Sequence, residues 1–151
     1  MKKPLALLLH DAISADSRPD EADVLVQVEQ VSAALAANDW RCKVLAATRD
    51  LKSLQKALVL LAPDCVVNLV ESLDGDGRLI HLVPALLQRM DIPFTGSGSD
   101  TLLLTSQKQL AKQWLRFHNI ATPRDLATED TAGEPVIQYI VKSVWEHASL
   151  G

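Results

Sequence analysis

The chain alternates short apolar runs with stretches in which apolar residues recur at helical spacing. Four runs have the length and composition of buried strands, at residues 5–9, 43–46, 65–70 and 92–95. The run at 65–70 is the clearest strand, because it is rich in β-branched residues and directly follows the breaker Pro63-Asp64. Continuous apolar runs of this kind are typical of parallel strands that are covered on both faces.

Helices are expected between these strands, because three sets of apolar residues recur every three or four positions and so form stripes. The stripes consist of Val24, Val28, Val31 and Leu35; of Leu51, Leu54, Leu58 and Leu61; and of Leu79, Leu82, Val83, Leu86, Leu87 and Met90. Strands that alternate with helices indicate an α/β fold, with an open parallel sheet, helices on both faces and right-handed crossovers.

The pattern changes after residue 95, where Gly96-Ser97-Gly98-Ser99 forms a flexible loop. We expect a short helical turn at 100–104, a helix capped by Ser106 that runs to about His118, a polar linker at 121–135 and a strand at 136–144. That strand has no partner later in the chain. Residues 121–151 should therefore be the least ordered part, or pair with a second copy in a homodimer.

Composition narrows the function classes. The chain has 151 residues, of which 48% are hydrophobic and 23% charged, as in an ordinary globular protein. Its net charge is -4 and no basic stripe is visible, which argues against a nucleic-acid partner. No segment approaches the ~20 apolar residues of a membrane span. Cys42 and Cys65 lack the spacing of a metal or redox motif, which favours a reducing, cytoplasmic location.

Polar loops follow two of the predicted strands. The first, at 10–21, contains Asp16, and the second, at 71–78, contains Asp76 and Gly77. Ligands of open α/β sheets bind at the carboxyl ends of strands, so we expect the two loops to lie side by side and to bind a substrate. The alternative is an ordinary solvated loop and a strand-to-helix turn. A calcium loop at 74–85 is excluded, because Ala85 stands where an EF-hand needs glutamate.

Two lysines are candidate phosphate ligands. Lys142 lies within an apolar run, where it is either a charge that protects an edge strand or a cation directed at a phosphate. Lys108 taken alone is a helix-surface lysine. Gly96-Ser97-Gly98 lacks the lysine of a Walker phosphate loop.

Four segments, in order along the chain, carry a family resemblance. They are Leu7-Leu8-Leu9 with Ser14-Ala15-Asp16; Val67-Asn68-Leu69-Val70-Glu71 through Gly75-Asp76-Gly77; Ile92-Pro93-Phe94-Thr95-Gly96-Ser97-Gly98 with Lys108; and Ile140-Val141-Lys142 through Gly151. Together they resemble the D-alanine–D-alanine ligases and related ATP-grasp carboxylate–amine ligases. Glu71 stands near a position where many D-alanine–D-alanine ligases have histidine, which favours the related ligases and leaves the substrate open.

The resemblance implies a Rossmann-like pre-ATP-grasp, substrate-binding domain at 1–95 and the truncated start of an ATP-grasp, ATP-binding domain at 96–151. The implied enzyme uses ATP and Mg²⁺ to activate a small amino-acid or peptide-like carboxylate as an acyl phosphate, which an amine then attacks. By position, Asp16, Glu71, Asp76 and Gly77 would bind the substrate, and Lys108, Lys142, Glu146, Ala148 and Ser149 would bind ATP.

The resemblance places no complete catalytic set and no metal ligand in these 151 residues, so the chain alone is expected to be inactive. The alternative is a non-catalytic, flavodoxin-like module that binds a nucleotide or a protein.

Overall fold

A three-stranded parallel sheet forms the centre of the molecule. The structure is a computed structural model, and it describes residues 2–13, 19–123 and 140–145. The strands are β1 (Leu5–Asp11), β2 (Arg41–Ala47) and β3 (Cys65–Leu69), in the order β2-β1-β3. Leu8 of β1 is opposite Val44 of β2 and Val67 of β3. The predicted parallel α/β fold is confirmed.

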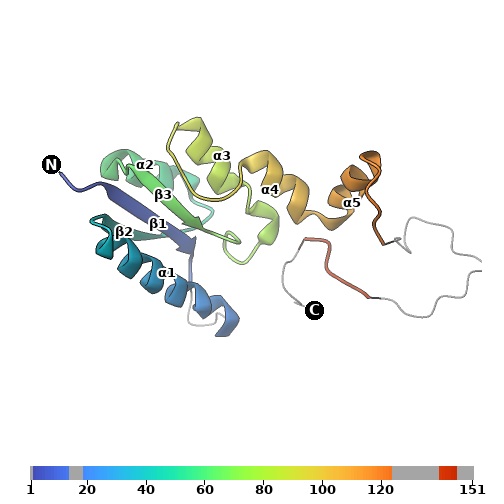
Figure 1. Cartoon of the computed structure of the whole chain (residues 1–151), viewed down its shortest axis with the longest axis horizontal. Coiled ribbons are helices and arrows are strands. Elements are labelled where there is room, and N and C mark those ends of the chain that lie inside the picture. Colours follow the sequence, from blue (N-terminus) through green and yellow to red (C-terminus); the bar gives the residue numbers. More distant parts are fainter. Residues whose placement is uncertain (1, 14–18, 124–139, 146–151) are drawn as a thin grey trace, which may run out of the picture.

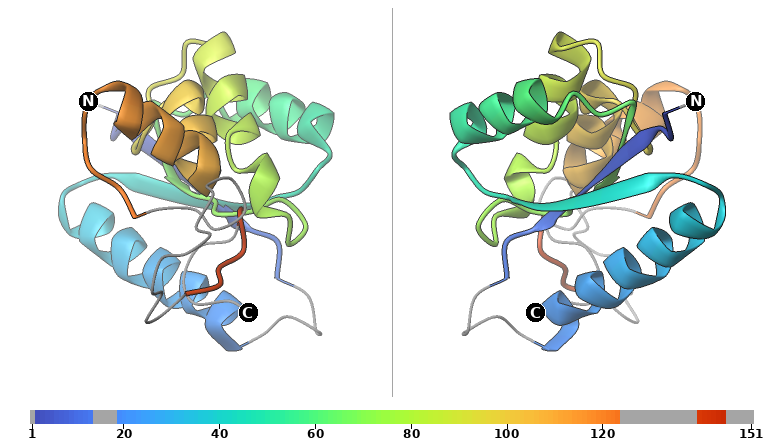
Figure 2. Two further views of the ribbon diagram at one scale, coloured as in Figure 1. Left: turned by 90° about the vertical axis from the view of Figure 1, so that its right-hand side faces the viewer. Right: turned by 90° about the vertical axis from the view of Figure 1, so that its left-hand side faces the viewer.

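Helices cover both faces of this sheet. Helix α1 (Pro19–Ala37) lies on one face, while α2 (Leu51–Leu61) and α3 (Leu82–Arg89) lie on the other (Figures 1 and 2). Successive residues of β1 point to opposite faces, so Leu7 and Leu9 join the core under α2 and α3, while Ala6 and Leu8 join the core under α1. Because both faces are covered, β1 is apolar from Leu5 to Leu9, as its sequence predicts.

Helix α2 shows how a predicted stripe becomes a packed face. Leu54 and Leu58 are buried in the core, and Leu51 and Leu61 pack at its margin. The helix begins after Asp50, whose Oδ1 accepts a hydrogen bond of 3.0 Å from the Ser53 N–H. A short 3-10 helix, η1 (Gly77–Leu79), precedes α3.

The strand predicted at 92–95 is reduced to one parallel bridge between Phe94 and Val66 of β3. The Val66 N–H donates to the Pro93 carbonyl at 2.8 Å, and the Thr95 N–H donates to the Val66 carbonyl at 2.9 Å. Pro93 has no N–H, so it cannot donate a further bond to a sheet ladder. The predicted segment therefore lies along β3 without being a full strand.

Two helices follow, α4 (Ser99–Ser106) and α5 (Lys108–Phe117), and they lead away from the sheet (Figure 1). The prediction that Ser106 caps the second helix was wrong. The Ser106 hydroxyl instead donates to the Leu102 carbonyl within α4, and the Gln107 side chain accepts from the Leu110 N–H to begin α5. Gln107 has an extended backbone, with φ -93° and ψ 102°, and this separates the two helices.

The strand predicted at 136–144 is also wrong where it can be compared. Residues 140–145 are irregular, and no strand within the described ranges pairs with them. A strand needs a neighbour for its backbone hydrogen bonds, and here the Val144 carbonyl accepts instead from the Lys108 N–H at 3.0 Å. Residues 136–139 lie outside the described part of the chain. In the described ranges, no helix has the length and apolar character needed to cross a membrane.

Candidate functional site

The candidate site lies at the edge of the sheet where the three strands end. Strands β1 and β3 are parallel neighbours, and His10 near the end of β1 is opposite Leu69, the last residue of β3. The segments that leave β1 and β3 therefore start side by side, as the sequence predicts. Asp16 itself lies outside the described residues, so its place beside the second loop stays a prediction.

Asp11, the last residue of β1, links the two segments directly. Its Oδ1 accepts hydrogen bonds from the Glu71 N–H at 2.8 Å and the Ser72 N–H at 3.2 Å, and its Oδ2 accepts from the Ser72 hydroxyl at 2.7 Å. Hydrogen bonds to an ionised carboxylate are stronger than those between neutral groups. The Asp11 carboxylate thus holds the start of the second loop against the end of β1.

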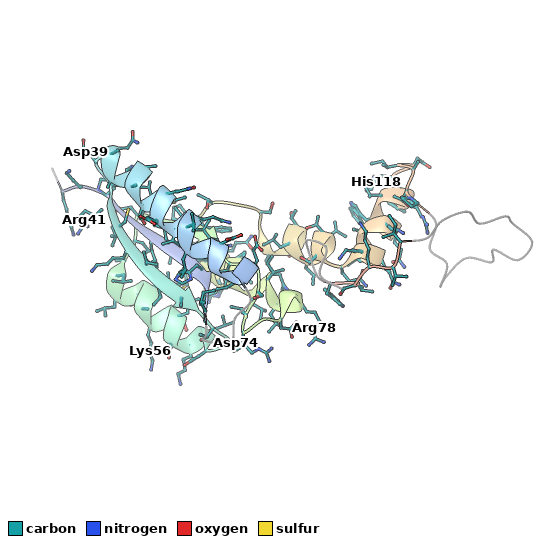
Figure 3. All side chains as sticks on the ribbon, turned by 90° about the horizontal axis from the view of Figure 1, so that it is seen from below. Asp39, Arg41, Lys56, Asp74, Arg78 and His118 are labelled. Carbon is teal, nitrogen blue, oxygen red and sulfur yellow. The ribbon has the colours of Figure 1, made fainter. Side chains whose placement is uncertain are left out.

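Arg49, just after β2, holds the middle of the same loop. Its Nε lies 3.4 Å from the Leu73 carbonyl oxygen and 3.7 Å from Asp74 Oδ2, and its Nη2 lies 3.5 Å from Asp76 Oδ2. The end of β1 and the residues that follow β2 and β3 consequently meet at residues 71–78. Figure 3 shows Asp74 and Arg78 of this loop at the opposite end of the sheet from Asp39 and Arg41.

The tip of the loop is a tight turn. The Leu73 and Asp76 main chains exchange two hydrogen bonds of 3.3 and 3.1 Å around Asp74 and Gly75. Both central residues have positive φ, 51° and 75°, as a type I′ turn requires. Glycine adopts such a conformation without the steric cost that a Cβ brings.

Asp76 was predicted to bind the substrate, but its carboxylate forms hydrogen bonds within the loop. The Arg78 guanidinium grips it with two hydrogen bonds of 2.8 and 2.7 Å, and the Arg78 N–H donates a third of 3.1 Å. These bonds, led by the one from the Arg78 side chain, lower the pKa of Asp76 to about 2. Asp76 is therefore ionised at neutral pH and fixes the start of η1.

Glu71 and Gly77 are the other described members of the predicted substrate set. Glu71 is exposed, and no hydrogen bond or ion pair from the rest of the described chain engages its carboxylate. Gly77 lies beside the segment 140–145, since a Cβ placed on it would be 3.6 Å from the Trp145 carbonyl oxygen. Of the two, only Glu71 offers a charged side chain to a ligand at this edge.

The two predicted ATP-binding lysines come from segments that touch. Lys108 begins α5, and its N–H donates to the carbonyl of Val144, two residues after the exposed Lys142. Glu146, Ala148 and Ser149 lie outside the described residues. Within the described ranges no three His, Cys, Asp or Glu side chains are grouped so as to hold a metal ion.

Sequence reasoning did not select Asp11 or Arg49 as site residues. Asp11 is the last residue of β1 and Arg49 lies two residues after β2, at the edge where ligands bind in such sheets. That position was the available signal, but their partners are 60 and about 25 residues further along the chain. A local pattern holds no information on such contacts.

Comparisons with known proteins agree with the predicted resemblance. No protein-family model matches the chain. It is 30% identical over 93 residues to a D-alanine–D-alanine ligase of Rhizorhabdus wittichii, and 36% identical over 104 residues to one of Chromohalobacter salexigens. These matches cover 59% and 62% of this chain but 29% and 31% of the relatives, so the chain spans less than a third of their length.

Comparison with solved structures also finds a D-alanine–D-alanine ligase. The crystal structure of a D-alanine–D-alanine ligase from Bacillus anthracis matches with a TM-score of 0.60 and 19% identity, over 80% of this chain and 36% of that one. The resemblance predicted from the four segments is confirmed: in fold, and in part of its sequence, this chain is similar to part of a D-alanine–D-alanine ligase.

Proposed function

We propose that the chain forms the substrate-binding part of an ATP-dependent carboxylate–amine ligase. The observation that carries this proposal is the sheet edge at which Asp11 and Arg49 join three strand ends to residues 71–78, in a chain similar to D-alanine–D-alanine ligases. Such an edge is where open α/β sheets bind small ligands. In this proposal residues 1–95 bind the substrate, and residues 96–151 begin the ATP-binding region.

The reaction proposed for the whole enzyme has two steps. A carboxylate oxygen of one amino acid takes the terminal phosphoryl group of ATP, giving an acyl phosphate and ADP. The amine of a second amino acid then attacks the acyl carbon and releases phosphate, leaving an amide. Phosphoryl transfer is catalysed chiefly by positioning and by charge stabilisation, so the protein must hold both reactants firmly.

The residues divide between the two reactants. Glu71 and Asp16 are the carboxylates proposed to bind the ammonium group of the amino acid, because Glu71 follows β3 at this edge and Asp16 comes next after β1 in the predicted first loop of the sequence. Lys108 and Lys142 are proposed to contact the phosphates of ATP, which the contact between their segments supports. Asp76 and Gly77 shape the loop that carries Glu71. No Mg²⁺ ligand is assigned, since the described residues offer no metal site.

The test is ADP formation by the longest protein that the gene encodes, with D-alanine and with a panel of other small amino acids. Amino-acid-dependent ADP formation together with a dipeptide product supports the ligase. Nucleotide binding without ADP formation under any of these conditions refutes it and supports the non-catalytic module.

A matched pair of variants locates the substrate site. Glu71→Gln removes the proposed ammonium ligand, and Glu29→Gln makes the same change at an exposed position on α1. A hydrogen bond to a charged group contributes about 1.5–3 kcal/mol, so Glu71→Gln should raise the amino-acid KM about tenfold to a hundredfold. Glu29→Gln should leave it unchanged. Equal KM values for the two variants would remove Glu71 from the substrate site.

A further inference from the structure

The Asp11 carboxylate forms a set of hydrogen bonds that the proposed ligase function does not itself require. Asp11 ends β1 and is paired in the sheet with Ala47 of β2, so its backbone is fixed by the central ladder. From this fixed point both carboxylate oxygens reach across to residues 60 and 61 positions later. Three donors, two N–H groups and one hydroxyl, occupy the two oxygens.

These bonds act on a defined part of the loop. The turn at 73–76 has its own two main-chain bonds, and Arg49 and Arg78 hold its carbonyl and carboxylate groups. Among the described residues, the main chain of Glu71 and Ser72 is held by Asp11 instead. A change at Asp11 should therefore release Glu71 and Ser72 and leave the turn in place.

The hydrogen bonds to Asp11 fix the main chain of Glu71 and leave its side chain available to a ligand. Its side chain is exposed, without a bonded partner in the described part of the chain, while its N–H is fixed 2.8 Å from Asp11 Oδ1. A carboxylate on a fixed main chain binds a ligand group with less loss of conformational freedom than one on a loose loop. Asp11 is less suited to that role, because its oxygens already accept three hydrogen bonds, out of about four that a carboxylate can accept.

We propose that Asp11 is a positioning residue, which holds the main chain of Glu71 and Ser72 so that the Glu71 carboxylate meets the ammonium group of an amino-acid substrate. This inference rests on the proposed function, in which Glu71 binds that ammonium group. Asp11 acts through Glu71 and does not touch the substrate.

The first experiment tests the positioning without any ligand. Amide hydrogen exchange is measured by NMR in the 151-residue chain and in two variants. Asp11→Ala removes the acceptors, while Asp64→Ala is the matched control, because Asp64 accepts the Leu5 N–H at 2.7 Å at the other end of the sheet. In Asp11→Ala the Glu71 and Ser72 amides should exchange at least about tenfold faster, as expected for the loss of charge-assisted bonds. Those of Leu73 and Asp76 should change less than about twofold, since their own turn bonds remain.

Equal protection of Glu71 and Ser72 in Asp11→Ala and in the unaltered chain would overturn the proposal. Loss of protection along the whole loop would overturn it as well, because Asp11 would then be a general structural residue. Asp11→Asn keeps one acceptor oxygen and should restore most of the protection. Ser72→Ala removes only the hydroxyl contact, and it keeps the test decisive if Asp11→Ala does not fold.

The second experiment is a double-mutant cycle for binding of D-alanine, followed by NMR titration of the chain. If Asp11 acts through Glu71, then Asp11→Ala should weaken binding, and the double variant Asp11→Ala/Glu71→Gln should bind no more weakly than Glu71→Gln alone. Independent, additive losses would overturn the positioning role and leave Glu71 as a ligand. No effect of Glu71→Gln would overturn the substrate assignment, and with it the role of Asp11.

Discussion

Helix α2 offers a controlled test of how the core supports this site. Leu58 and Leu60 lie two residues apart on the same helix, but Leu58 is 1% exposed and Leu60 is 85% exposed. Replacing either leucine by alanine changes helix propensity equally. Removing three buried carbons at about 0.8 kcal/mol each costs Leu58→Ala about 2.4 kcal/mol, and the cavity left behind raises the expected loss to about 3 kcal/mol. For Leu60→Ala the same reasoning gives less than about 0.5 kcal/mol.

The measurement is urea denaturation of the two variants and the unaltered chain, followed by circular dichroism. We expect the free energy of unfolding to fall by about 3 kcal/mol in Leu58→Ala, which corresponds to a drop in Tm of about 6–12 °C for a chain of this size. Leu60→Ala should unfold within about 0.5 kcal/mol of the unaltered chain. Equal losses in the two variants would refute the packing of α2 against the sheet.

Three further predictions concern the loop and the lysines. The pKa of Asp76 is lowered to about 2, so the stability that the ionised Asp76 carboxylate contributes is present above its ordinary pKa of 3.8 and is lost as pH falls toward 2. An NMR carboxyl titration checks this pKa, and Arg78→Gln should return it toward 3.8. Gly75→Ala should destabilise the chain by about 1 kcal/mol in urea denaturation, because φ is 75° there, although a Cβ would meet no atom within 4 Å. In calorimetry the 151-residue chain should bind Mg-ATP no tighter than about millimolar, because that level needs about 4 kcal/mol. Surface ion pairs with the half-buried Lys108 and the exposed Lys142 contribute at most about 1 kcal/mol each, so a micromolar Kd would refute this.

The fold was predictable wherever local pattern and tertiary burial coincide. The stripe of α2 is the set of side chains that packs on the sheet, and the apolar run of β1 is buried on both faces. Prediction failed where a single residue decided the outcome. Pro93 has no N–H for a further ladder bond to β3, and the Ser106 hydroxyl bonds back into α4 instead of capping α5.

An apolar pattern in the sequence also does not show whether another part of the protein packs against it. Residues 140–144 carry the composition of a strand, yet the part of the chain that the structure describes provides no strand beside them. Apolar residues also recur at helical spacing in α5, but Trp114 and Phe117 among them are 51% and 77% exposed, with their rings 6.2 Å apart. Periodicity predicts which side of a helix is apolar. It does not predict which other part of the protein covers that side.

The candidate site required a different kind of information. The predicted loops could be located because the carboxyl ends of parallel strands meet at one edge, which is a property of the topology. Asp11 and Arg49 act through partners about 25 to 60 residues away, and those contacts exist only once the sheet has assembled. A carboxylate at the end of a central strand is well suited to this task, because the ladder fixes its backbone and its two oxygens reach several loop donors. A polar residue at the end of a buried strand therefore merits the same attention as the loop that follows it.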